Sequence, residues 1–179
     1  MINDPSVSHR RIFYYIYSMM KEEYKFLFEV FDSIAELNDD DAMLLNEAIN
    51  ATVYSYAPYS RFRVAAMAKL ENGKIVAGTN QENASYPAGI CAERVLLSTA
   101  SSLYPGIAVQ TIAITYQNEN GKSNHPISPC GICRQTLQEY EHRQKSAIRL
   151  ILGGMKGKVF VIAAASSLMP LAFTGDELQ

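Results

Sequence analysis

The sequence predicts an α/β fold, a three-layer α/β/α sandwich with a mixed central sheet of about five strands. Apolar residues recur at helical spacing in three segments, and short runs rich in β-branched residues lie between them. The pair Asn72-Gly73 joins two of these runs. A chain of 179 residues that is 48% hydrophobic and 19% charged suits one globular domain, and it contains no internal repeat.

The N-terminal residues form an extension, 1–38, before a domain that covers 39–179. A basic patch at His9 and an apolar run over 12–20 imitate a secretory signal, but no small-residue cleavage site follows, so a signal peptide is disfavoured. Met20 is a plausible natural start, and we allow for flexibility over 1–20. Tyr24 to Phe31 is expected to form a short strand.

The first half of the domain is expected to contain a helix and a hairpin. Asparagine and aspartates at 38–41 favour a helix start, and apolar residues at helical spacing predict a helix from about 40 to 56. Strands are predicted over 62–70 and 74–79. Asn72-Gly73 favours a tight turn with positive φ between them, so the two strands should be antiparallel.

The second half alternates helices and strands. A helix from Ala92 to Leu103 is stopped by Pro105-Gly106, and a strand is predicted over 111–116 before a polar loop. A third helix begins near Cys130, with Cys133, Leu137 and Tyr140 on one face. Two short buried strands, 149–152 and 158–164, complete the order.

The charge and the apolar runs of the sequence argue against two classes of protein, and the cysteine content indicates the compartment. Sixteen basic and eighteen acidic residues give a net charge of −2, and the pI is about 5.9, which argues against a nucleic-acid-binding protein. No apolar run reaches the roughly 18 to 20 residues that cross a bilayer, so no membrane partner is expected. Three cysteines, an odd number, indicate a reduced compartment and a cytoplasmic location.

All three cysteines fall at predicted helix starts. Cys130 and Cys133 are one turn apart, so their sulfurs can bind the same metal ion. Cys91 would supply a third ligand if the two helix N-termini meet, leaving a fourth position for water. Three protein ligands with an open position are typical of catalytic zinc, so we predict one Zn²⁺ per chain. A redox-active pair and buried inert cysteines are the alternatives.

Glu93 lies two residues after Cys91, well placed to reach a zinc-bound water. A His or Cys, one residue, Glu and a later Pro-Cys-x-x-Cys are the signature of zinc deaminases. Both halves are present, at Cys91-Ala92-Glu93 and in the segment Pro-Cys-Gly-Ile-Cys over 129–133. Glu93 is therefore the predicted catalytic residue. By itself it would be interpreted as a solvated first-turn glutamate that the helix dipole stabilises.

With these motifs, the sequence resembles the homotetrameric type of cytidine deaminase over 42–179. Three further stretches carry the resemblance: Tyr-Ala-Pro-Tyr-Ser-Arg-Phe at 56–62, Asn-Gln-Glu-Asn-Ala-Ser-Tyr at 80–86, and the tail Ser-Leu-Met-Pro-Leu-Ala-Phe at 167–173. The resemblance implies a catalytic domain over 39–179. It also implies zinc-dependent hydrolysis of cytidine and 2'-deoxycytidine to uridine and 2'-deoxyuridine, with release of ammonia, in pyrimidine salvage. Ala65 departs from the family, which commonly has glycine there.

The resemblance assigns the substrate-binding residues. Asn80 and Glu82 would hydrogen-bond the ribose hydroxyls, Phe62 would pack on the pyrimidine, and the backbone amide of Ala92 would meet cytosine O2. Without the zinc motifs, Asn80 and Glu82 would be interpreted as a polar loop and Phe62 as a core residue.

The resemblance also implies roles for Arg94 and the tail. Arg94 would bond the ligating sulfurs, which helps to offset the formal charge of −1 that three thiolates leave on zinc. Phe173 would approach the pocket of an adjacent subunit in a homotetramer. The alternative is that Leu168 and Phe173 pack on their own domain. His125 is interpreted as a loop residue.

A free nucleoside is the favoured substrate. Deaminases that act on polynucleotides need a positive channel or aromatic platforms, whereas this chain is slightly acidic and its basic residues are scattered. Two alternatives remain open. A structural zinc module would need a fourth protein ligand, and the sequence offers no obvious one. A related deaminase could act on a different heterocycle, such as an aminonucleoside antibiotic.

Overall fold

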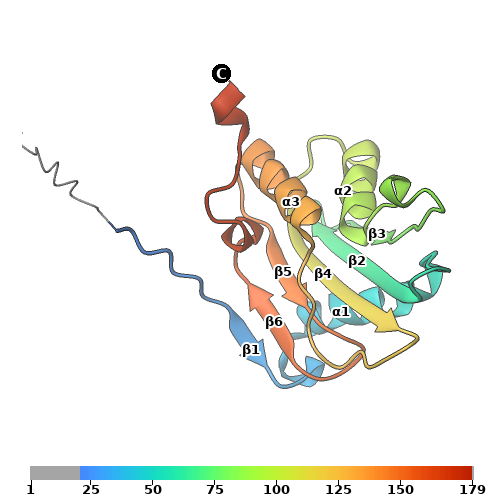
Figure 1. The fold of residues 1–179 in the computed structure, drawn as a ribbon. Coiled ribbons are helices and arrows are strands. Elements are labelled where there is room, and N and C mark those ends of the chain that lie inside the picture. Colours follow the sequence, from blue (N-terminus) through green and yellow to red (C-terminus); the bar gives the residue numbers. More distant parts are fainter. Residues whose placement is uncertain (1–20, 179) are drawn as a thin grey trace, which may run out of the picture.

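A sheet of six strands lies between two layers of helices in the computed structural model, which describes residues 21–178 (Figure 1). The spatial order is β1-β6-β5-β4-β2-β3. β4 and β5 are parallel, and the other neighbouring pairs are antiparallel, which confirms the mixed sheet. The strands are β1 (Glu29–Phe31), β2 (Phe62–Leu70), β3 (Ile75–Thr79), β4 (Val109–Asn118), β5 (Arg149–Leu152) and β6 (Val159–Ile162).

The strand count exceeds the expected five by one because the extension joins the sheet. β1 pairs with β6 over three residues, and Phe28, just before β1, packs on Phe160 with ring centroids 4.9 Å apart. The predicted strand from Tyr24 to Phe31 is correct only in its last three residues. The signal-like segment, the start at Met20 and the flexibility allowed over 1–20 lie outside the residues that the structure describes.

The helices cover both faces of the sheet, as the three-layer prediction requires. α1 (Asp39–Ala51) packs on one face, with an aliphatic cluster that includes Leu45 and Ala65. α2 (Ala92–Leu103) and α3 (Gly131–Gln144) pack on the other, where Leu96 and Leu137 are buried (Figure 1). Ala65 is buried in this cluster, so its side chain contacts the α1 layer.

Local chemistry explains most element boundaries. The β2–β3 hairpin turns at Gly73, whose φ is +77°, as the Asn72-Gly73 pair predicts. α2 ends at Leu103 before Pro105, also as predicted. The first helix is shorter than expected: α1 ends at Ala51, and the chain continues as a single 3₁₀ turn over Thr52–Tyr54.

The start of α1 is held by polar contacts. The Asn38 side chain caps the helix by accepting a hydrogen bond from the Asp41 amide at 3.0 Å. Both oxygens of Asp41 accept hydrogen bonds from the Arg149 guanidinium at 2.6 Å, which ties α1 to β5. Across residues 21–178, no helix has the length and apolar composition needed to span a membrane.

Candidate metal centre and active site

Three cysteine sulfurs converge where the first turns of α2 and α3 meet. Cys91 is the N-cap of α2, Cys130 is the N-cap of α3, and Cys133 lies in the first turn of α3. The Cys91 and Cys130 sulfurs are 3.7 Å apart, and those of Cys130 and Cys133 are 3.5 Å apart. All three are free thiols, and their sulfurs lie within 4.8 Å of one another.

These sulfurs fit a tetrahedral zinc ion. A Zn–S bond of about 2.3 Å gives a tetrahedron whose sulfur–sulfur edges are about 3.8 Å long, close to the two observed separations. Among the residues that the structure describes, this is the one cluster of three metal-ligating side chains, and it contains no fourth protein ligand. The set therefore matches a catalytic rather than a closed structural site.

Hydrogen bonds among the thiols favour a negative charge on Cys91, because they lower its pKa. Hydrogen bonding by the Cys133 thiol is the largest of the effects that lower the pKa of Cys91 to about 6, and the charge of Arg94 acts in the same direction. The same contact, together with burial, raises the pKa of Cys133. The first amides of α2 and α3 have no partner within their helices, so both positive helix ends face this charge.

Glu93 lies beside the cysteines in the first turn of α2 and is only 4% exposed. Burial raises the pKa of its carboxyl, while its own backbone amide, the Cys133 thiol and the charge of Arg94 act in the opposite direction. A buried carboxyl with a raised pKa, next to metal-ligating sulfurs, is suited to accepting and returning a proton near neutral pH.

A cavity of about 200 Å³ opens onto this cluster. It brings together two of the three cysteines, Glu93 and three of the four predicted substrate-binding residues. Its lining is Phe62, Val64, Asn80, Cys91, Ala92, Glu93, Ile127, Ser128 and Cys130.

Asn80 lines the cavity, and the β2 backbone fixes its side chain. The amide oxygen accepts a hydrogen bond from the Val64 amide at 2.8 Å, and the amide nitrogen donates to the Phe62 carbonyl at 2.9 Å. The next residue, Gln81, forms paired backbone hydrogen bonds with Ile90, which directly precedes Cys91. The segment predicted to bind the nucleoside is thus joined by backbone contacts to the segment that carries Cys91.

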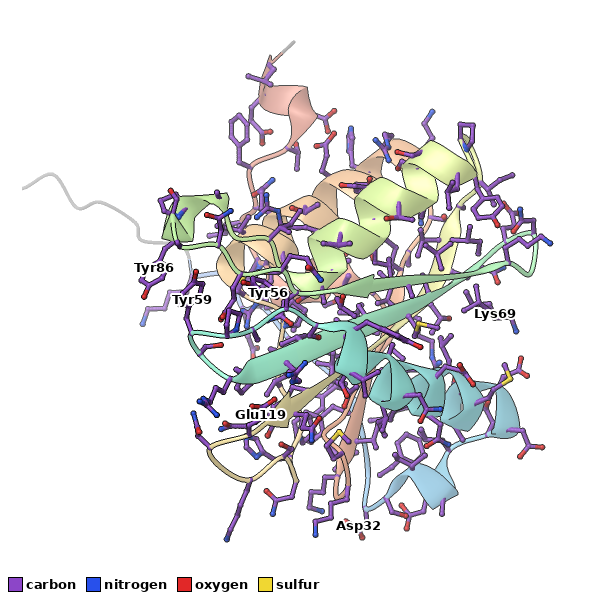
Figure 2. The ribbon with its side chains drawn as sticks, turned by 90° about the vertical axis from the view of Figure 1, so that its right-hand side faces the viewer. Asp32, Tyr56, Tyr59, Lys69, Tyr86 and Glu119 are labelled. Carbon is purple, nitrogen blue, oxygen red and sulfur yellow. The ribbon has the colours of Figure 1, made fainter. Side chains whose placement is uncertain are left out.

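Glu82 is not part of the cysteine cavity. It lines a separate cavity of about 300 Å³ with Tyr59 and Tyr86, which lie on the same side of the molecule in Figure 2 with ring centroids 6.0 Å apart. Burial raises the pKa of its carboxyl, but hydrogen bonds from Ser60 and from the backbone amides of Tyr59 and Ser60 outweigh that effect and lower it. Glu82 is thus held as a carboxylate.

Phe62 contacts both the cavity, as its predicted binding role requires, and the aromatic side chains behind the cavity. Its half-buried ring lines the cavity and stacks on Tyr116, with centroids 4.8 Å apart and planes 18° apart. The Tyr116 hydroxyl in turn lies 3.1 Å from Nδ1 of His125 in the following loop. His125 is therefore a loop residue, as expected, that contacts the aromatic stack behind the cavity.

Arg94 and Phe173 lie outside the cavity lining. The charge of Arg94 lowers the pKa of Cys91, but within residues 21–178 the sulfurs form hydrogen bonds with one another and none with the Arg94 guanidinium. The Phe173 carbonyl accepts a hydrogen bond from the Gln135 side chain at 2.9 Å, while the residue itself is 57% exposed. Within this chain, Phe173 does not reach its own cavity.

Sequence reasoning missed two residues that hold the site together. A Cβ on Gly78 in β3 would lie 2.4 Å from the Ala92 carbonyl and from the Leu96 amide, so glycine lets α2 approach the sheet. An isolated glycine within a strand was the available signal. Arg134, which follows the last cysteine, donates from Nε to the Pro129 carbonyl at 2.9 Å. No spacing rule indicated that contact.

Comparisons with known proteins agree with this geometry. The family described as "Cytidine and deoxycytidylate deaminase zinc-binding region" matches residues 38–148, a range that includes all three cysteines and Glu93. The cytidine deaminase of Halalkalibacterium halodurans is 36% identical over 142 residues, which cover 78% of this chain and 98% of that protein. The cytidine deaminase of Sporosarcina psychrophila is 33% identical over 141 residues, covering 78% and 96%.

A solved structure shares the fold. The crystal structure of cytidine deaminase from Burkholderia pseudomallei is similar with a TM-score of 0.63 and 38% sequence identity. The match covers 73% of this chain and 97% of that chain.

Proposed function

This chain belongs to the cytidine and deoxycytidylate deaminase family, and on that premise we propose that it is a zinc-dependent cytidine deaminase. It hydrolyses cytidine to uridine and releases ammonia. We include 2'-deoxycytidine as a second substrate and pyrimidine salvage as the setting. The observation that carries the proposal is the convergence of Cys91, Cys130 and Cys133 with buried Glu93 at one cavity.

In the proposed reaction the protein binds the metal and moves protons. Zinc held by the three sulfurs supplies Lewis-acid chemistry that makes water nucleophilic near neutral pH. Glu93 takes the proton from the attacking water and delivers it to N3 of cytosine. The water oxygen bonds to C4 as a hydroxyl group. Glu93 then takes the proton of that hydroxyl and delivers it to the amino nitrogen, so that the bond from C4 to the amino nitrogen breaks, ammonia leaves and the C4 carbonyl of uridine forms. Such proton transfer contributes about 10² to 10⁴ in rate.

The four predicted substrate-binding residues are proposed to orient the nucleoside. The Ala92 amide has no partner within α2, so it is free to donate to cytosine O2. Asn80 has one N–H and one oxygen lone pair left after its two bonds to β2, enough for a ribose hydroxyl. Glu82 accepts both backbone bonds at Oε2, which leaves Oε1 for the sugar. Phe62 would face the pyrimidine ring.

We propose a homotetramer in which neighbouring subunits complete each site. The cavity of about 200 Å³ is smaller than the roughly 300–1,000 Å³ of typical ligand sites. In the tail, Leu171 is fully exposed and Phe173 is 57% exposed, so both side chains are available for contact with a neighbouring subunit. Arg94 is proposed to support the charge of the bound thiolates, and the three free thiols favour the cytoplasm.

One measurement tests the activity. Purified chain with zinc quantified per subunit is mixed with cytidine, and the loss of cytidine absorbance is followed. The expected result is close to one zinc per chain and turnover of cytidine, with cytosine a far poorer substrate because it lacks the ribose. Full zinc without any cytidine turnover would contradict the proposed substrate. Turnover of an aminonucleoside analogue alone would assign the different heterocycle instead.

A second measurement tests the shared site. Light scattering should give about 80 kDa, four times the 19.9 kDa of one chain. Phe173→Ala should raise KM for cytidine, whereas Leu103→Ala, which shortens an equally exposed apolar side chain at the far end of α2, should not. A fully active monomer at micromolar concentration would contradict the shared site.

A further inference from the structure

The start of the tail is held by α3 and by the N-terminal extension. Buried Glu141 on α3 accepts hydrogen bonds from the amides of Ala165 and Ser166, at 2.8 and 3.0 Å. The Tyr24 hydroxyl donates to the Ser167 carbonyl at 2.7 Å. These contacts fix the short helical turn over 165–168 from which the tail leaves the domain.

Arg134 links this turn to the metal-binding loop. Its Nε donates to the Pro129 carbonyl at 2.9 Å, and its Nη1 donates to the Leu168 carbonyl at 3.2 Å. Pro129 is buried and directly precedes Cys130, while Leu168 is the last residue of the turn. One guanidinium therefore holds the peptide before a metal ligand and the peptide from which the tail departs.

The start of α3, where Arg134 lies, is electrostatically unfavourable for a cation. The hydrogen bonds of its guanidinium to two carbonyls explain why an arginine nevertheless occupies this position. Arg134 lies in the first turn of α3, at the positive end of the helix dipole, and that turn contains no acidic residue. Among the ion pairs of the described part of the chain, none includes Arg134. A planar guanidinium can serve two separate acceptors from Nε and Nη1, which the single ammonium of lysine cannot do in the same geometry.

We propose that Arg134 is a positioning residue that couples the Cys130 ligand to the tail. By holding the Pro129 carbonyl, it sets the orientation of the peptide that carries Cys130. By holding the Leu168 carbonyl, it sets the direction in which the Phe173 segment leaves the domain. Its role differs from that of Arg94, whose charge lowers the pKa of Cys91. This coupling rests on the proposed function in two respects only: the three cysteines hold zinc, and the tail contacts a neighbouring subunit.

The test uses the zinc-loaded full chain with Arg134→Met and two readouts that do not need cytidine. The first is the rate at which zinc passes to a chromogenic chelator, which should rise about tenfold, as for other residues that orient metal ligands. The second is hydrogen exchange over 169–174, which should become faster. Replacing zinc by Co²⁺ adds a spectroscopic signature, because the thiolate-to-cobalt band should shift when Cys130 is reoriented.

The matched control is Arg143→Met near the other end of α3. Arg143 stacks on Tyr140 at 4.1 Å and donates to Ser101. Its replacement by methionine therefore removes one positive charge, as Arg134→Met does, but changes no contact with the Pro129 loop or with the tail. It should leave all three readouts unchanged. A folded Arg134→Met chain that matches wild type in zinc release and in the cobalt band would overturn the proposal, as would a change in zinc release with no change in the tail.

Arg134→Lys covers the case in which the methionine variant fails to fold. Lysine keeps the charge but lacks the planar fork that reaches both carbonyls in this geometry, so zinc release and tail exchange should fall between wild type and methionine, and equality with wild type in both would overturn the proposal. Gln135→Leu should loosen only the tail, since Gln135 contacts the Phe173 carbonyl and not the loop. A wild-type chain that holds zinc but does not turn over cytidine would contradict the function and leave these readouts intact.

Discussion

The N-terminus of α1 and the N-termini of α2 and α3 use the same helix chemistry in opposite ways. At α1, Asn38 caps the helix, aspartates occupy the first turn, and Asp41 pairs with Arg149. At α2 and α3, the N-caps are Cys91 and Cys130, and neither makes a side-chain capping hydrogen bond. The first turn is thus stabilised at α1, whereas at the other two helices its free amides are left facing a metal site.

Because of this difference, the residues that stabilise the fold and the residues proposed for catalysis lie at different helix ends. Helix ends that lack a side-chain cap give up roughly 1 kcal/mol each in local stability. Their amides and positive dipole ends instead face the thiolates and the cavity beside them. Variants at α1 should therefore change unfolding without changing turnover, whereas variants at the cysteines and Glu93 should greatly reduce turnover.

The largest expected effect comes from Cys91→Ser. The serine oxygen should not replace the thiolate, so zinc and turnover should both be lost. Serine is nevertheless a good N-cap, so the variant should be about 1 kcal/mol more stable to urea than Cys91→Ala, which also loses zinc. Metal analysis and urea unfolding of both variants provide the test. Full zinc occupancy in either would show that Cys91 is not a ligand.

Glu93→Gln should have the next largest effect. Glutamine has the same shape but cannot accept the proton from water, so turnover should fall by about 10² to 10⁴ while zinc stays bound. Turnover and metal content measured on one preparation decide the outcome. Retention of more than about a tenth of wild-type turnover would remove Glu93 from the role of proton carrier.

Arg149→Met should affect stability alone. It leaves Asp41 nearly buried without its partner, at a cost of about 2 kcal/mol because Arg149 is one-third exposed and partly screened. Tm should fall by roughly 4–8 °C with kcat unchanged. Lys69→Met is the control. Lys69 pairs with Asp40, which lies on the same helix as Asp41, but the pair of Lys69 and Asp40 is exposed, so Tm should hardly move. Figure 2 shows the position of Lys69. Equal shifts in both variants would contradict the prediction.

The smallest effect is expected for Asn38→Ala, which removes the cap of α1. The free energy of unfolding should fall by about 1 kcal/mol, and Asn38→Ser should recover most of it because serine also caps. Urea unfolding at fixed zinc concentration measures both. A drop in kcat in the folded alanine variant would show that the α1 end is coupled to the site after all.

The chemistry of the site was readable from the sequence because it depends on local spacing. Cys130 and Cys133 lie one turn apart on any helix, and Cys91 and Glu93 share a helix start, so their types and intervals already predicted a metal with a carboxyl beside it. The hairpin at Gly73 and the end of α2 before Pro105 were predictable for the same reason. Each depends on the φ angles and hydrogen bonds of a few consecutive residues.

Contacts between distant segments were decided by the tertiary structure alone. Whether β1 joins the sheet depends on the free edge of β6, about 130 residues later in the chain. Asn80 forms two hydrogen bonds with the backbone of β2, and Glu82 lies in a different cavity from Asn80. Both results depend on how the loops pack, because packing decides which donors and acceptors lie near each side chain. The bridge from Arg134 to Leu168 likewise joins residues whose spacing has no local rule, since a guanidinium bonds whichever carbonyls the fold brings within about 3 Å of it.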